Sequence, residues 1–258
     1  SPGAGLIRSV NDGNFYGTTM LGGTANLGTV YQMTPAGDVT TVHSFTGPDG
    51  AKPLAGLLQA ADGKLYGTTF NGSTSAGVAF SLDLSGSAFS VFGAFVGNAE
   101  GAGARAPLFE AADGSLYGVT GAGGLADAGT AFRVTPDDHF ELLSPAVFTG
   151  DGRTPANPAT AVIQGGDGNL YGLDSNVFDP AAASGVSQIF KLASDGTATV
   201  VYRFSAESSQ APLLKATDGN LYGTTTRSIF RLSPSGVVTT LGTSSLGSAL
   251  IQASDGNF

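Results

Sequence analysis

The chain has 258 residues, with 11 Lys and Arg against 20 Asp and Glu, 40 Gly and a formal net charge of −9. The acidic balance, with a pI near 4.4, argues against nucleic acid as the main partner, and no apolar run approaches the ~18 residues that cross a membrane. The absence of Cys excludes a disulfide framework, thiol catalysis and a Cys-based zinc site, while 41% hydrophobic residues suffice for a core.

A motif of the form Asp-Gly-x-Leu-Tyr-Gly, with Phe15 in place of the Leu in the first copy, recurs along the chain. Complete copies occupy residues 12–19, 62–69, 113–120, 167–174 and 218–225, and the chain stops inside a sixth copy at 255–258. Repetition with a period of about 50 residues is typical of solenoids, propellers and other repeat arrays. Because the copies share one motif, all repeats are expected to share one structure.

Each repeat is predicted to form four short strands, called A to D here. In the second repeat, strand A covers 56–60, a turn follows at Asp62 and Gly63, and strand B covers 65–69. Strand C follows a glycine-rich loop and alternates in period two, as a strand does. Its inward residues are Tyr31 and Met33, Phe80 and Leu82, Phe132 and Val134, Phe190 and Leu192, and Phe230 and Leu232. Strand D runs to Phe45, Phe95, Phe148 or Phe204 in the first four repeats.

Four strands per repeat predict an all-β protein, a β-propeller of four-stranded antiparallel blades with five full repeats. A single sheet of this size cannot bury both faces, whereas sheets packed face to face around a ring can. The alternative, a β-solenoid, usually has shorter repeats without two hairpin turns in each. A glycine follows the large Tyr of every strand B, and its missing side chain should let neighbouring strands or blades approach closely.

The repeated phrase also carries a family resemblance. Gly56-Leu57, then Ala60-x-Asp62-Gly63-x-Leu65-Tyr66-Gly67-Thr68-Thr69, resembles the bacterial tandem repeat called GloVer and, more distantly, the repeats of NHL-type propellers. The resemblance covers essentially the whole chain and implies an exported or surface-attached propeller, without catalytic residues to transfer. Repeat four departs from the pattern with Leu173-Asp174, and repeat five has almost no loop between Thr225 and Ile229.

The predicted blades cover approximately residues 1–50, 51–101, 102–155, 156–207 and 208–247, and 248–258 begin a further repeat. Because this last segment duplicates a strand that Gly5-Leu6-Ile7 already supplies, we expect the 258 residues to belong to a longer chain whose ring has more than five blades. The alternative is a five-bladed ring in which the surplus strand swaps with or replaces the N-terminal one.

Propeller topology places the A–B and C–D turns on one face and the B–C and D–A loops on the other. Loops that vary on a rigid scaffold are where binding usually evolves. We therefore expect any ligand on the B–C and D–A face. The candidate binding residues there are Asp49, Asp151, Arg153, Asn176 and Asp179.

The repeated residues have a structural explanation. The Asp of each Asp-Gly turn is expected to hydrogen-bond its own backbone, and most of these turns supply one carboxylate, so no metal site and no cofactor are predicted. The repeated Tyr is expected in the core, with its hydroxyl meeting a neighbouring strand or turn. An aromatic sugar platform in each blade is the alternative.

Catalysis has little support in the sequence. The two histidines, His43 and His139, fall in different blades and outside the expected ligand face, so no catalytic residue is assigned. The predicted function is a non-enzymatic, exported binding or structural module, located extracellularly, in the periplasm or at a bacterial surface, with a protein or carbohydrate partner. A glycan-binding propeller is the first alternative, and a propeller hydrolase or lyase is the second.

Overall fold

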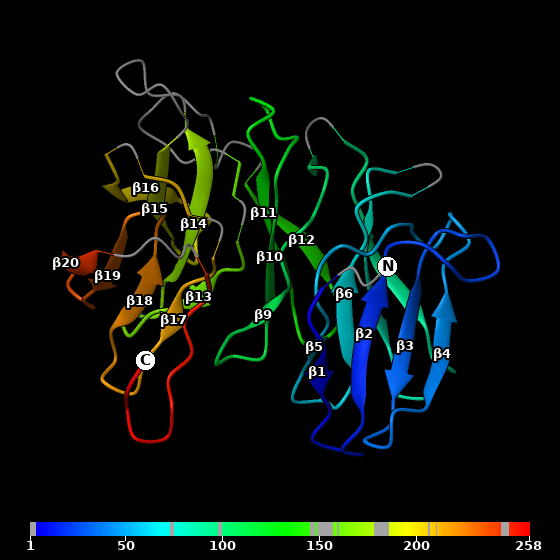
Figure 1. The fold of residues 1–258 in the computed structure, drawn as a ribbon. Helices are drawn as coiled ribbons and strands as arrows, with labels where there is room; N and C mark the ends of the chain where they lie inside the picture. The colour runs from blue at the N-terminus through cyan, green and yellow to red at the C-terminus, as the bar shows by residue number, and fades with distance from the viewer. Residues whose placement is uncertain are drawn as a thin grey trace.

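The structure is a computed structural model that describes residues 4–72, 75–97, 100–144, 148, 157–158, 160–177, 186–205, 207–209, 211–243 and 248–258. Twenty strands are assigned within these residues, in five antiparallel four-stranded sheets (Figure 1). The described residues contain no helix long and apolar enough to cross a membrane.

Each sheet is one repeat, and we call the sheets blades 1 to 5. Blade 1 holds β1 (Ile7–Arg8), β2 (Phe15–Thr19), β3 (Thr29–Met33) and β4 (Val39–Ser44). Blade 2 holds β5 (Leu58–Gln59), β6 (Leu65–Thr68), β7 (Val78–Leu82) and β8 (Ser90–Ala94). Blade 3 holds β9 (Phe109–Glu110), β10 (Leu116–Thr120), β11 (Thr130–Val134) and β12 (Phe140–Ser144). Blade 4 holds β13 (Ile163–Gln164), β14 (Leu170–Val177), β15 (Val186–Leu192) and β16 (Ala198–Arg203). Blade 5 holds β17 (Leu214–Lys215), β18 (Leu221–Thr224), β19 (Ser228–Leu232) and β20 (Val238–Thr243).

The strand order confirms the predicted A-B-C-D meander in every blade. In blade 2 the A–B hairpin closes when the amide of Ala60 donates to the Lys64 carbonyl at 3.1 Å, which leaves a three-residue loop. Gly63 lies in this loop at φ +85°, a conformation that glycine adopts without strain. Strand A is shorter than predicted, because only Leu58 and Gln59 pair with strand B.

The glycine of strand B makes room for the aromatic ring of strand C. Gly118 pairs directly with Phe132, and a Cβ built on Gly118 would lie 2.2 Å from Phe132 Cζ and 2.7 Å from Leu108 Cδ2. The same contact recurs at Gly67, Gly172 and Gly223 with the rings of Phe80, Phe190 and Phe230. The predicted close approach is therefore confirmed, and the ring of the same sheet accounts for it.

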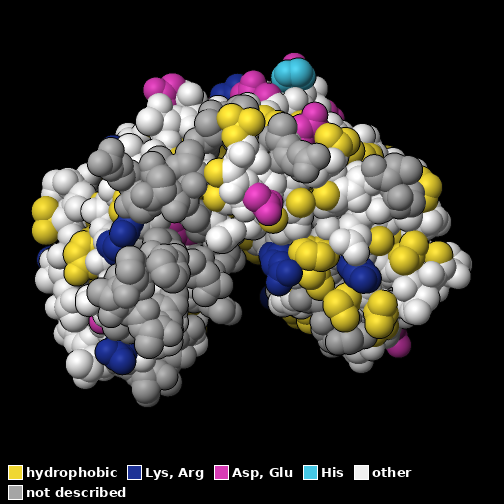
Figure 2. All heavy atoms as spheres, turned by 90° about the horizontal axis from the view of Figure 1, so that it is seen from above, with side chains coloured by type: hydrophobic (Ala, Val, Ile, Leu, Met, Phe, Trp, Pro, Cys, Tyr) yellow, Lys and Arg dark blue, Asp and Glu magenta, His cyan; other side chains and the backbone are white. Residues whose placement is uncertain are grey.

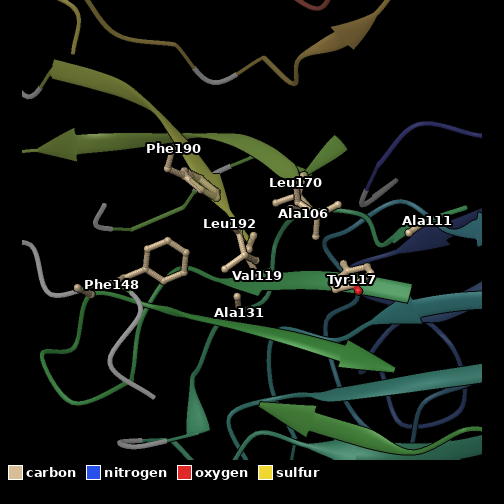
Figure 3. Close-up of a cluster of buried hydrophobic side chains, with 11 residues drawn as sticks. Ala106, Ala111, Tyr117, Val119, Ala131, Phe148, Leu170, Phe190 and Leu192 are labelled. Carbon is tan, nitrogen blue, oxygen red and sulfur yellow. The ribbon is translucent and has the colours of Figure 1, made fainter. Parts of the chain in front are cut away.

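Hydrophobic clusters join each blade to the next. The cluster between blades 3 and 4 brings Val119 and Ala131 against Phe190 and Leu192, with Phe148 beside them (Figure 3). The rings of Phe148 and Phe190 meet edge to face, with centroids 5.4 Å apart. Three further clusters join blades 1 and 2, blades 2 and 3, and blades 4 and 5. Among the described residues, no such cluster joins blade 5 to blade 1.

The five blades form an open arc, which is indented deeply on one side when seen from above (Figures 1 and 2). One face of blade 1 is correspondingly exposed: Leu6 is 43% and Val39 63% accessible, whereas the Leu108 that is equivalent to Leu6 in blade 3 is 4% accessible. Tyr31 and Met33 were predicted to point inward but are only half-buried, because no preceding blade covers them.

Residues 248–258 pack against blade 5 as strand A of a following blade would. The amide of Thr217 donates to Gln252 Oε1 at 3.1 Å, just as the amide of Val10 in blade 1 donates to Gln59 Oε1 of blade 2 at 2.9 Å. The Phe258 ring also lies on the Tyr222 ring, with centroids 4.4 Å apart. That the native ring has more than five blades stays a prediction.

Candidate functional site

The face of A–B and C–D turns is built from one repeated polar unit. In blade 1, Asp12 Oδ1 accepts the amide of Asn14 at 3.0 Å, and Asp12 Oδ2 accepts the Tyr16 hydroxyl at 2.7 Å. The same Tyr–Asp bond is 2.9 Å in blade 2, 2.8 Å in blade 4 and 2.7 Å in blade 5. Burial, followed by the hydrogen bond to Asp12, raises the pKa of Tyr16 to about 12. The structural interpretation of the repeated Asp and Tyr is confirmed at these positions.

A second repeated unit closes the B–C connection on the opposite face. The Thr that stands two residues after the strand B glycine accepts a strand C amide through Oγ1, from Thr29 to Thr19 at 3.1 Å and from Val78 to Thr69 at 3.0 Å. The remaining examples are Thr130 to Thr120 and Ser228 to Thr225. These hydroxyls therefore form hydrogen bonds within their own B–C hairpin.

Blade 4 replaces this Thr with Asp174, the departure noted in the sequence. Its Oδ1 accepts the amide of Gln188 at 3.1 Å and its Oδ2 accepts Gln188 Nε2 at 2.7 Å, and both side chains are fully buried. Arg203 in turn donates through Nε to Gln188 Oε1 at 3.2 Å. Asp174 thus accepts the strand C amide as the Thr does in other blades, and its second oxygen joins a buried polar network with Gln188 and Arg203.

Of the five predicted binding residues, Asp49 is the one whose side chain the structure describes. Asp151, Arg153 and Asp179 lie outside the described residues, and of Asn176 only the backbone, in β14, is described. The predicted group is therefore not brought together within the described part of the chain, and its role stays a prediction.

Asp49 itself organises the connection that follows β4. Its Oδ1 accepts the amide and the hydroxyl of Thr46 at 2.7 and 2.9 Å, and its Oδ2 lies 2.9 Å from His43 Nε2. The His43 ring stacks on Phe89 of blade 2, with centroids 3.8 Å apart. Partial burial alone would raise the pKa of Asp49, but the bonds from Thr46 and His43 hold it below its ordinary value.

This geometry predicts a pH-dependent contribution of Asp49 to stability. A carboxyl whose pKa is lower in the folded state stabilises the fold above its unfolded value of about 3.9, and this contribution is lost as the pH falls through the folded value. Asp49→Asn should lower the free energy of unfolding by about 1 kcal/mol at neutral pH. Urea melts at several pH values should show the difference shrinking below about pH 4. Asp38→Asn is the control, because Asp38 is exposed and accepts the Thr34 hydroxyl at a long 3.4 Å.

A cavity of about 200 Å³ lies between blades 2 and 3, on the face of A–B and C–D turns. Asp62 and Tyr66 of blade 2 line one side, and Glu110 and Asp138 of blade 3 line the other. We call it the blade 2–3 cavity. The cavity could not be predicted from one repeat, because its three carboxylates come from an A–B turn, a strand and a C–D turn of two blades. The signal that could have found it is departure from the repeat, since Glu110 and Asp138 each stand where no other blade has an acid.

The opposite face carries one preorganised pair at a junction. The guanidinium carbon of Arg105, which precedes blade 3, lies 4.6 Å from the centre of the Phe70 ring of blade 2. Phe70 is half-buried and Arg105 is exposed, so a cation and an aromatic surface are presented together to solvent. Neither residue repeats in the other blades.

Five antiparallel meanders joined face to face in chain order define a β-propeller built from tandem repeats. The sequence matches the family described as the Gloeobacter/Verrucomicrobia repeat over residues 1–230, and the chain belongs to this family. The family expected from the Asp-Gly-x-Leu-Tyr-Gly motif is thus confirmed.

Solved structures support the same fold. Virginiamycin B lyase from Staphylococcus aureus superposes with a TM-score of 0.60 at 16% identity, over 93% of this chain and 69% of that one. A gluconolactonase from Xanthomonas campestris superposes with a TM-score of 0.51 at 14% identity, over 93% of this chain and 76% of that one. At these identities the likeness concerns the fold alone. A comparison with curated proteins finds no match.

Proposed function

We propose that this propeller is a non-enzymatic, exported module that binds a protein or carbohydrate at a bacterial surface through its B–C and D–A loops. One observation carries the proposal: the polar groups that recur from blade to blade are engaged within the fold in four of the five blades. The repeated Asp accepts from its own turn and from Tyr, and the repeated Thr accepts from strand C. Binding chemistry then belongs to side chains that differ between blades.

The Phe70–Arg105 pair is the described feature of that face best suited to contact a ligand. An aromatic ring offers a flat surface to a sugar ring or an apolar side chain, and a guanidinium offers donors to carboxylates or hydroxyls. The two groups already lie 4.6 Å apart, so binding a ligand should cost little additional side-chain entropy.

Binding of the purified chain to a glycan array and to bacterial envelope fractions tests this proposal. Arg105→Ala and Phe70→Ala should each weaken binding about tenfold, the effect of losing a central contact of an interface. Arg227→Ala is the matched control, because Arg227 is an exposed cation in the B–C turn of blade 5. Equal binding by all three variants, or no binding to either material, would contradict the proposal. Fractionation of the native host tests export, with the protein expected outside the cytoplasm.

The hydrolase or lyase alternative has one observation in its favour, the His43–Asp49 pair with its 2.9 Å contact. An acid that orients a histidine is part of many catalytic sites. Here, however, one face of the imidazole is covered by Phe89. Turnover of lactone or glycoside substrates that His43→Ala abolishes would favour the enzyme and exclude the non-enzymatic module.

A further inference from the structure

The blade 2–3 cavity departs from the repeat at the positions that line it. The position of Glu110 holds a neutral or basic residue in every other copy, namely Arg8, Gln59, Gln164, Lys215 and Gln252. The position of Asp138 holds glycine in the four other blades, namely Gly37, Gly86, Gly196 and Gly236. Glu110 and Asp138 thus stand at positions of this junction where no other blade has an acid.

Asp138 contributes to the fold only a long, exposed contact with Lys64, at 3.8 Å. This residue lies at φ +62°, which glycine adopts freely and other residues adopt at a cost. Glu110 accepts the amide of Ala61 at 3.1 Å, but Gln59 and Gln164 accept the equivalent amides at 2.9 and 3.2 Å without a charge. An amide at this position would therefore serve the junction equally well.

The equivalent space at another junction is closed. Between blades 4 and 5 it measures about 10 Å³ and holds one carboxylate, that of Asp167. The blade 2–3 cavity measures about 200 Å³, and its floor is formed by the buried side chains of Leu116 and Val134 with Pro136 beside them. The same architecture thus leaves almost no space between blades 4 and 5, but an open cavity with apolar and acidic lining residues between blades 2 and 3.

Charge at the cavity is unbalanced. Asp62, Glu110 and Asp138 contribute three carboxylates. Lys64 Nζ lies 3.5 Å from Asp62 and 3.8 Å from Asp138, and its side chain stays 43% accessible. Burial and the bond to Asp62 raise the pKa of Tyr66, and the charges of Asp138 and Glu110 add to the effect. The cavity therefore has a negative potential that one exposed ammonium leaves uncompensated.

We propose that the blade 2–3 cavity binds a primary alkylammonium group, with its aliphatic chain on Leu116, Val134 and Pro136 and its ammonium beside the carboxylates of Glu110 and Asp138. A compact ammonium has three donors, and the carboxylates of Glu110 and Asp138 are charged acceptors that line the cavity. The ring of Tyr66 adds an aromatic wall that favours a cation. A free alkylamine and a lysine side chain carry the same group.

The experiment is a titration of the ¹⁵N-labelled chain, followed by NMR, with n-butylamine and with N-acetyl-lysine N-methylamide in separate arms. Saturable shifts are expected for the amides of Ala61, Asp62, Gly114 and Asp138, weakening as salt is raised. A response to both probes identifies the group alone as the ligand, and a response to the lysine derivative alone identifies a peptide source. The neutral isostere n-butanol should give no saturable shift.

Two variants that restore the repeat residue separate binding from folding. Glu110→Gln and Asp138→Gly should each weaken binding about tenfold, because each removes a charge-assisted contact. Both should fold, since other blades carry these residues, and Asp138→Gly should melt a few degrees higher because the strain at φ +62° is relieved. Asp137→Asn is the matched control, one residue away and outside the cavity lining, and should bind as the wild type does.

Three outcomes would overturn the proposal. The first is no saturable shift with either amine at tens of millimolar in low salt. The second is equal loss of binding in Asp137→Asn, which would indicate a diffuse surface charge effect. The third is binding that appears only in Lys64→Asn, which would show that Lys64 itself fills the cavity.

Discussion

Gly118→Ala is expected to destabilise the chain by about 2–3 kcal/mol, the upper part of the range for an overpacked core position. The new methyl group would lie 2.2 Å from Phe132 Cζ and 2.7 Å from Leu108 Cδ2, and neither side chain has free space. Phe132 is fully buried and also meets Phe95 across the blade 2–3 junction, with centroids 5.1 Å apart. Moving the ring would therefore disturb both the sheet and the junction. Urea unfolding followed by circular dichroism measures the effect.

Gly121→Ala is the matched control. A Cβ there would meet nothing closer than the Gly103 carbonyl oxygen at 3.7 Å, and the backbone conformation suits any residue. This substitution should leave the free energy of unfolding within about 0.5 kcal/mol of the wild type. If both variants unfold at the same urea concentration as the wild type, the packing of the strand C ring does not explain why strand B has a glycine at this position.

Phe190→Ala is expected to cost about 3–5 kcal/mol, as large-to-small changes of buried aromatic residues do. Phe190 is fully buried between blades 3 and 4, where it packs with Phe148, Val119 and Leu192 (Figure 3). Its loss should open a cavity at that junction. Leu125→Ala, at a side chain 72% accessible, is the control and should change stability little. Differential scanning calorimetry of both variants tests the prediction.

A second substitution makes the test sharper. A Cβ on Gly172 would lie 2.5 Å from Phe190 Cζ, so Gly172→Ala alone should be strongly destabilising. In the Phe190→Ala background the clash is absent, and Gly172→Ala should then be tolerated. Additive losses in the double variant would contradict the paired packing of glycine and ring.

The sequence was enough to predict the strands because each repeat combines period-two alternation with turn residues at fixed places. The alternation in strand C placed Phe132 and Val134 inward, and both are buried. The Asp and Tyr of the turn were also interpretable, since residues four apart across a tight hairpin must meet. These are local relations, and five copies of the same pattern reinforced one another.

The candidate site was less predictable, because it depends on relations between blades. That Asp62 and Asp138 border one cavity follows from how blade 3 packs on blade 2, which no spacing along the chain encodes. The contact of Asp49 with His43 was also missed, since His43 was placed in strand D and outside the loops that carry Asp49. The burial of Tyr31 was overpredicted, because the pattern of a strand does not say whether a neighbouring sheet is present.

The four junction clusters make the stability of this chain a sum of nearest-neighbour couplings. Blades 2, 3 and 4 are each held by two couplings, whereas blade 1 is held by one and blade 5 by one and by residues 248–258. The terminal blades should therefore fray first on heating, and unfolding should move inward as in a one-dimensional chain of linked units. Blade 3, which lies farthest from both ends of the arc, is then the last to lose its neighbours.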